Sequence, residues 1–142
     1  METTHYRIEL LSDEPILLFE TYPEYTLSGD WRQVDIETRQ FLDQSSEPLF
    51  YLIDITKASL SLEDIVLAAN IGARGPNTEA MNQEIPLWKH PNIQEMVFVT
   101  TRPILTLAAK GLDSLAFGNI KTKTFATQEE ALGYIRARVA ES

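Results

Sequence analysis

Residues 50–70 join an unbroken apolar run to a capped helix, and they constrain the fold more than any other stretch of the chain. Residues 50–53 show no alternation of apolar and polar side chains, which is typical of a strand buried on both faces of a parallel sheet. Residues 54–56 carry that strand to its carboxyl end. Ser61 then predicts a helix N-cap, because Asp64 follows three residues later as in a capping box.

The residues before this stretch predict an antiparallel hairpin followed by a helix. Residues 6–10 alternate and residues 16–19 are apolar, with the turn signal Ser-Asp-Glu-Pro between them. Residues 21–27 contain Pro23 and predict a bent or interrupted extended segment. Asp30 predicts the start of a helix with two distinct faces. The expected inner face is Trp31, Val34, Thr38, Phe41 and Leu42, and the outer face is Arg32, Asp35, Arg39 and Gln40.

The residues after it repeat the pattern of strand and helix. Residues 96–99 predict a second central strand, and residues 120–125 alternate as an edge strand does. Thr127 and Glu130 form a capping box that opens a final helix. Together, these elements predict one α/β domain over residues 1–142, with a four- to five-stranded mixed sheet, an N-terminal antiparallel hairpin and helices packed on it.

Composition excludes several classes of protein. The net charge of −9 opposes binding to nucleic acid, and no Lys/Arg cluster reverses it locally. With no cysteine, the 142-residue chain forms no disulfide and no thiolate metal site. No stretch approaches the roughly 18 apolar residues that a membrane span needs, and the N-terminus lacks the pattern of a secretory signal. We therefore expect a cytoplasmic protein.

Catalytic motifs are missing from the sequence. The chain has no G-x-S-x-G motif and only two histidines, His5 and His90, so we expect no enzyme activity, no cofactor and no bound metal. We expect His5 to be solvated and His90, which follows Trp88, to be structural or solvated. Residues 72–75 follow a predicted helix and so do not read as a phosphate loop.

Two junctions between a strand and a helix are the best candidates for a binding surface. The candidate residues there are Asp54, Thr56, Thr101 and Arg102. The free backbone N–H groups at these junctions either bind an anion or are capped by hydroxyl side chains. The irregular residues 86–92, with Trp88 and His90, are expected to border a groove or a subunit interface. This loop and the predicted edge strand also suggest a homodimer.

The order of elements resembles the STAS superfamily, the SpoIIAA-like fold of anti-sigma-factor antagonists. The resemblance lies in residues 50–56, residues 96–99 and the ending Thr-Phe-Ala-Thr-Gln-Glu-Glu-Ala-Leu of residues 124–132. It implies a non-enzymatic regulatory or protein-interaction domain that acts in bacterial signalling by partner switching. The phosphorylated serine of those antagonists corresponds to Ser61 or the nearby Ser59, although the D-S-x-G turn of the family is absent here.

The same fold has lipid-binding, CRAL-TRIO-like relatives, and they offer an alternative. Residues 77–92 form an insertion relative to the minimal domain. On this reading the insertion covers a pocket for a small apolar ligand.

Overall fold

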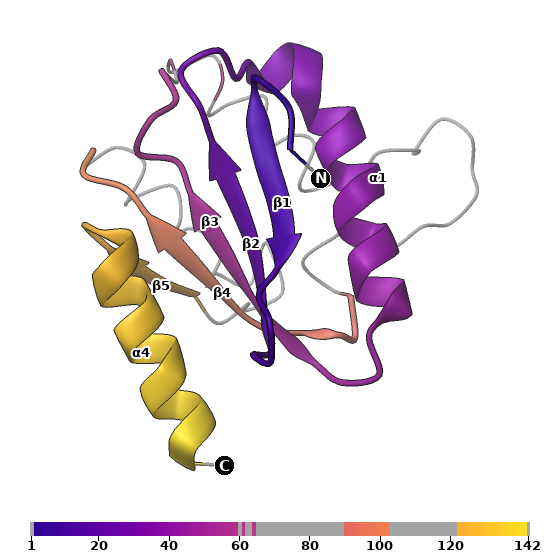
Figure 1. Cartoon of the computed structure of the whole chain (residues 1–142). Helices are drawn as coiled ribbons and strands as arrows, with labels where there is room; N and C mark the ends of the chain where they lie inside the picture. The colour runs from indigo at the N-terminus through magenta and orange to yellow at the C-terminus, as the bar shows by residue number, and fades with distance from the viewer. Residues whose placement is uncertain (1, 60, 62–63, 65–89, 103–121, 142) are drawn as a thin grey trace, which may run out of the picture.

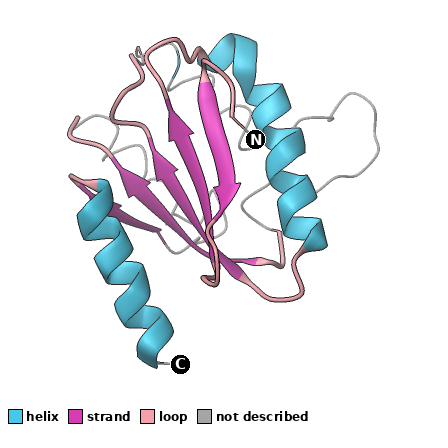
Figure 2. Ribbon diagram, in the orientation of Figure 1, coloured by secondary structure: helices cyan, strands magenta, loops and turns pink. Residues whose placement is uncertain are grey.

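The computed structural model describes residues 2–59, 61, 64, 90–102 and 122–141, which form a five-stranded mixed sheet with a helix on each face (Figures 1 and 2). The strands lie side by side in chain order, from β1 to β5. β1 and β2 are antiparallel, and β2 to β5 are parallel. The predicted mixed α/β sheet with an antiparallel start is therefore confirmed. The elements are β1 (Tyr6–Leu10), β2 (Ile16–Thr21), α1 (Leu27–Gln44), β3 (Leu49–Asp54), β4 (Ile93–Val99), β5 (Thr122–Phe125) and α4 (Gln128–Glu141).

Two layers of apolar side chains hold the sheet between the helices. On one face α1 covers alternate residues of the strands, and on the other α4 does so (Figure 1). Each large apolar side chain that is fully buried contributes about 1.5 to 3 kcal/mol. The α1 layer contains Tyr6, Ile8, Leu17, Phe19, Tyr51, Ile53 and Met96 with Val34 and Leu42 of the helix, and the α4 layer contains Ile16, Leu18, Phe50, Leu52, Val97 and Val99 with Ala131 and Ile135.

The start of α1 differs from the prediction. The extended segment expected over residues 21–27 is interrupted: β2 ends at Thr21, Thr26 is again extended, and α1 already begins at Leu27. Between them the Tyr25 N–H donates to the carbonyl of Tyr22 (2.9 Å), a turn that places the ring of Tyr25 in the core. Asp30 is not the N-cap residue. It lies inside the helix, and its carboxylate accepts a hydrogen bond from the backbone N–H of Thr26 (2.9 Å).

The two faces of α1 are also less distinct than predicted. Asp35, expected on the outer face, is buried and forms an ion pair with Arg39. The pairing explains how a carboxylate tolerates burial there. Trp31, expected as a core anchor, is only half-buried, and the guanidinium of Arg32 lies 5.1 Å from its ring centroid.

Both predicted capping boxes are confirmed by their hydrogen bonds. At α4, the Thr127 hydroxyl accepts from the Glu130 N–H (3.1 Å) and donates to the Glu130 carboxylate (3.2 Å). At Ser61, the hydroxyl accepts from the Asp64 N–H (3.2 Å), and the Asp64 carboxylate accepts from the Ser61 N–H (2.8 Å). The predicted helix after Ser61, the helix that would follow Arg102, and residues 86–89 with Trp88 fall almost entirely outside the residues that the structure describes.

Candidate functional site at the carboxyl ends of the strands

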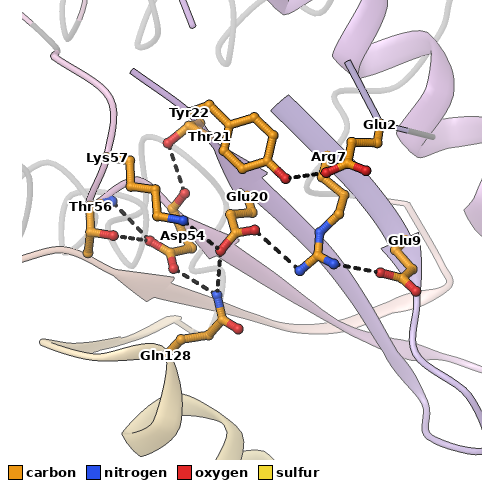
Figure 3. Close-up of polar contacts among 10 residues, drawn as sticks. All are labelled: Glu2, Arg7, Glu9, Glu20, Thr21, Tyr22, Asp54, Thr56, Lys57 and Gln128. Carbon is orange, nitrogen blue, oxygen red and sulfur yellow. Dashed lines mark hydrogen bonds and ion pairs between the residues drawn. The ribbon is translucent and has the colours of Figure 1, made fainter. Parts of the chain in front are cut away.

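Two carboxylates lie side by side where β2 and β3 end. Glu20 and Asp54 are register partners on these parallel strands. They are only 9% and 4% exposed, and Figure 3 shows their side chains turned toward one another. We call them the carboxylate pair. Buried carboxylates require donors or cations, so their neighbours determine what this end of the sheet can do.

The carboxylate of Asp54 organises the exit from β3. Its Oδ1 atom accepts from the backbone N–H of Thr56 (2.9 Å) and from the Thr56 hydroxyl (2.6 Å). Its backbone carbonyl accepts from the hydroxyl of Thr21 (3.0 Å) on β2. An aspartate that bonds to the backbone two residues later fixes a tight turn. Asp54 and Thr56 thus form one unit, which directs the chain out of the sheet.

Gln128, the first residue of α4, bridges the carboxylate pair. Its Nε2 atom donates to Asp54 Oδ2 (2.8 Å) and to Glu20 Oε2 (3.1 Å) (Figure 3). One side-chain amide therefore supplies a hydrogen bond to each carboxylate. It also fastens the N-terminus of α4 to the ends of two strands.

Cations complete the surroundings of Glu20. Arg7 Nη2 lies 3.2 Å from Glu20 Oε1, and Lys57 Nζ lies 3.7 Å from Glu20 Oε2. The Lys57 ammonium also lies 5.4 Å from the ring centroid of Tyr22, and its side chain is 52% exposed. All four oxygens of the carboxylate pair thus have a partner within the chain. Cations therefore surround Glu20, whereas Asp54 is held by uncharged donors.

The end of β4 lies beside this cluster. The Ile55 N–H donates to the carbonyl of Val99 (3.0 Å), which ties the exit of β3 to the exit of β4. Thr100 is buried, and its hydroxyl accepts from the Arg102 N–H (3.2 Å). Thr101 is exposed. The strand ends therefore bring together Asp54, Thr56, Thr101 and Arg102, four residues that the sequence singled out.

The two candidate switch serines are exposed. Ser59 and Ser61 follow the Asp54 turn, and both side chains are accessible. The Ser61 hydroxyl also lies 3.1 Å from Asp64 Oδ2, so it is engaged in the capping box. We refer to the exposed side chains of Thr56, Lys57, Ser59, Ser61 and Thr101 as the exit surface.

His90 lies at the opposite end of the sheet. It precedes β4, so the ends of parallel strands separate it from Asp54. Its Nδ1 atom accepts from the Asn92 N–H (3.0 Å), which places the ring proton on Nε2, where it faces Asp43 (2.8 Å). Asn92 caps the carbonyls of Leu42 (2.7 Å) and Ser45 (3.1 Å) at the end of α1. His90 is therefore buried and structural, and it does not belong to the exit surface.

His5 is less solvated than predicted. It is half-buried, and its Nδ1 atom lies 3.0 Å from Asp30 Oδ2. Burial tends to raise the pKa of Asp30, but the hydrogen bonds from the Thr26 N–H and from His5 outweigh it and lower that pKa. This contact joins the chain before β1 to the first turn of α1.

In the part of the chain that the structure describes, no three His, Asp or Glu side chains cluster as metal ligands, and no helix is long and apolar enough to cross a membrane.

Comparison with known proteins places the fold. The sequence matches no protein-family profile and no curated protein. Its structure is similar to that of an uncharacterised protein of the DUF3478 family from Shewanella loihica PV-4, described as having a SpoIIAA-like fold. The two chains share 19% identity over 95% of this chain and 98% of the other, with a TM-score of 0.54. This chain has a SpoIIAA-like fold. The fold predicted from the resemblance is therefore confirmed.

Proposed function

We propose that this SpoIIAA-like domain is a non-enzymatic regulatory domain that binds a protein partner through the exit surface. The observation that carries the proposal is the carboxylate pair. Each of its oxygens has a donor or cation from the chain itself, so among the described residues the buried carboxylates at the strand ends support the surface and are not left without partners. The accessible groups above them are hydroxyls and one ammonium, which suit contact with another protein.

Phosphorylation of Ser61 or Ser59 is the regulatory step that we propose for this surface. Both hydroxyls are accessible to a kinase. A phosphoryl group on Ser61 would meet the carboxylate of Asp64, which now lies 3.1 Å from the hydroxyl. It would also add negative charge within a few residues of Lys57. Modification would therefore change both the capping box and the charge that a partner meets.

Affinity capture from cell extract tests partner binding. The wild-type protein is compared with a variant that carries Lys57→Glu and Thr101→Asp on the exit surface. Glu47→Lys reverses an exposed charge beyond the end of α1 and serves as the matched control. A protein retained by the wild type and by the control, but lost with the double variant, is the expected result. A partner retained equally by all three proteins would contradict the proposed surface.

Native mass spectrometry of the purified protein separates this proposal from the alternative, a domain that binds a small apolar ligand. A retained small molecule would favour the alternative. Our proposal expects the mass of the bare polypeptide, or twice that mass for the homodimer that we expect, with no added ligand. We further propose that the protein acts in the cytoplasm.

A further inference from the structure

We propose that Gln128 couples the docking of α4 to the conformation of the turn formed by residues 54–59, so that a partner at this turn, or a modification at or next to it, loosens the first turns of α4. The regulatory meaning of this coupling rests on the proposed function. The coupling itself is a property of the folded chain, and it is measured without any partner.

The coupling follows from how the carboxylate of Asp54 is shared. Its Oδ1 atom accepts hydrogen bonds from the N–H and the hydroxyl of Thr56, on the turn. Its Oδ2 atom accepts a hydrogen bond from the side-chain amide of Gln128, on α4. Because the carboxylate is rigid and 96% of the residue's surface is buried, its two oxygens cannot reorient independently. A turn that pulls Thr56 away therefore rotates the oxygen that faces Gln128.

Glu20 repeats this arrangement on the neighbouring strand. Its Oε2 atom lies 3.7 Å from Lys57 on the turn and 3.1 Å from Nε2 of Gln128 on α4. A phosphoryl group or an acidic partner at the exit surface competes with Glu20 for Lys57, since both bind a lysine ammonium. Loss of Lys57 leaves Glu20 with Arg7 and Gln128 among the described residues and redistributes charge around the same amide.

The rest of α4 is anchored independently. The Tyr134 hydroxyl donates to the buried carboxylate of Glu95, and Arg138 Nη1 lies 3.3 Å from that carboxylate. Arg136 pairs with Glu14 at an exposed position (2.8 Å). The effect of the turn is therefore expected in the first turns of α4 and not in its last.

Hydrogen exchange under native conditions tests the coupling with two variants and their combination. Thr56→Val removes the hydroxyl donor while it keeps the branched shape, and Gln128→Leu removes the bridging amide. We expect Thr56→Val to speed exchange at the start of α4 about threefold or more relative to β3 amides. Gln128→Leu should speed exchange in residues 55–59 by a similar factor, and the double variant should show less than the product of the two effects.

Controls keep the test decisive. Arg136→Gln breaks an α4 contact far from the carboxylate pair and should leave residues 55–59 unchanged. If Gln128→Leu does not fold, Gln128→Asn is used in its place, because asparagine keeps the amide but has a shorter side chain. Changes confined to the segment that carries each substitution, or effects that simply multiply, would overturn the coupling. Failure to capture a partner would contradict the proposed function, but it would not change the hydrogen-exchange result that tests the coupling.

Discussion

Substitution of Ser61 tests both the capping box and the proposed switch. The Ser61 hydroxyl accepts from the Asp64 N–H (3.2 Å), and Ser61→Ala removes that bond. Loss of an N-cap hydroxyl costs about 0.5 to 2 kcal/mol in the free energy of unfolding. We expect about 1 kcal/mol here, because the bond from the Ser61 N–H to the Asp64 carboxylate (2.8 Å) remains.

Aspartate and asparagine at position 61 should behave differently, although both are good caps in general. The serine hydroxyl lies 3.1 Å from Asp64 Oδ2, so Ser61→Asp brings two carboxylates close together. Like charges about 4 Å apart repel by about 1 kcal/mol in water and by more near a protein surface. Part of this is offset by the helix dipole and by solvent screening. We expect Ser61→Asp to be about 1 kcal/mol less stable than Ser61→Asn at low salt.

Urea titration at low and high salt measures the difference. Salt at about 1 M shortens the Debye length to about 3 Å and should bring the two variants together. An aspartate variant as stable as the asparagine variant at low salt would refute the electrostatic reasoning. Binding to a captured partner then tests the switch: Ser61→Asp should change the Kd about tenfold, about 1.4 kcal/mol, while Ser61→Asn should not. An aspartate variant that binds like the wild type would end the switch hypothesis.

Four further predictions concern the stability and the oligomeric state of the domain. Asn92→Ala removes both side-chain donors at the end of α1, and urea titration should show a loss of about 1 to 2 kcal/mol with partner affinity unchanged. Tyr6→Phe leaves the Glu37 carboxylate without that donor and should cost about 1 to 3 kcal/mol, whereas adding Glu37→Met should recover most of the loss; equal losses would contradict this. Burial raises the pKa of Tyr6, Tyr25 and Tyr51 above the value of about 10 that tyrosine has in the unfolded chain. The stabilisation that these neutral side chains give the folded state is therefore complete below about pH 10 and is lost as the pH rises above it. Circular dichroism and tyrosinate absorbance should therefore report alkaline unfolding in one transition, and free titration of these residues in the folded state would contradict it. Sedimentation should show a homodimer through the edge strand β5, and a monomer well above micromolar concentration would exclude it.

Much of the fold was predictable because its signals are local. The unalternated runs that form β3 and β4 identify central strands, and the capping box at Thr127 locates the start of α4 to within a single turn. The position of Asp54 and Thr56 at the end of β3 was predictable for the same reason, since they directly follow an apolar run. Asp54 was expected in a binding surface, however, and its side chain is buried.

The neighbours of Asp54 were not predictable, because the contacts join distant parts of the chain. Gln128 is separated from Asp54 by 74 residues, and no local pattern pairs them. Glu20 was missed although it carries the same signal as Asp54, an acidic residue directly after an apolar strand. The contact of His90 with Asp43 likewise joins residues that are 47 positions apart, and no local pattern pairs them.

Tertiary packing also overrode local preference in α1. The aspartate at position 30 has the sequence signature of an N-cap, yet the helix begins at Leu27, two residues after the buried Tyr25. Its carboxylate still satisfies a backbone N–H, that of Thr26, from within the helix.

The most direct test of the central claim is a hydrogen-exchange footprint of the complex with a captured partner. The account predicts protection in peptides that contain residues 55–61 and 100–102, with no protection over residues 43–48 at the opposite end of the sheet. Protection confined to that opposite end, or to the outer face of α1, would contradict the proposed interaction surface.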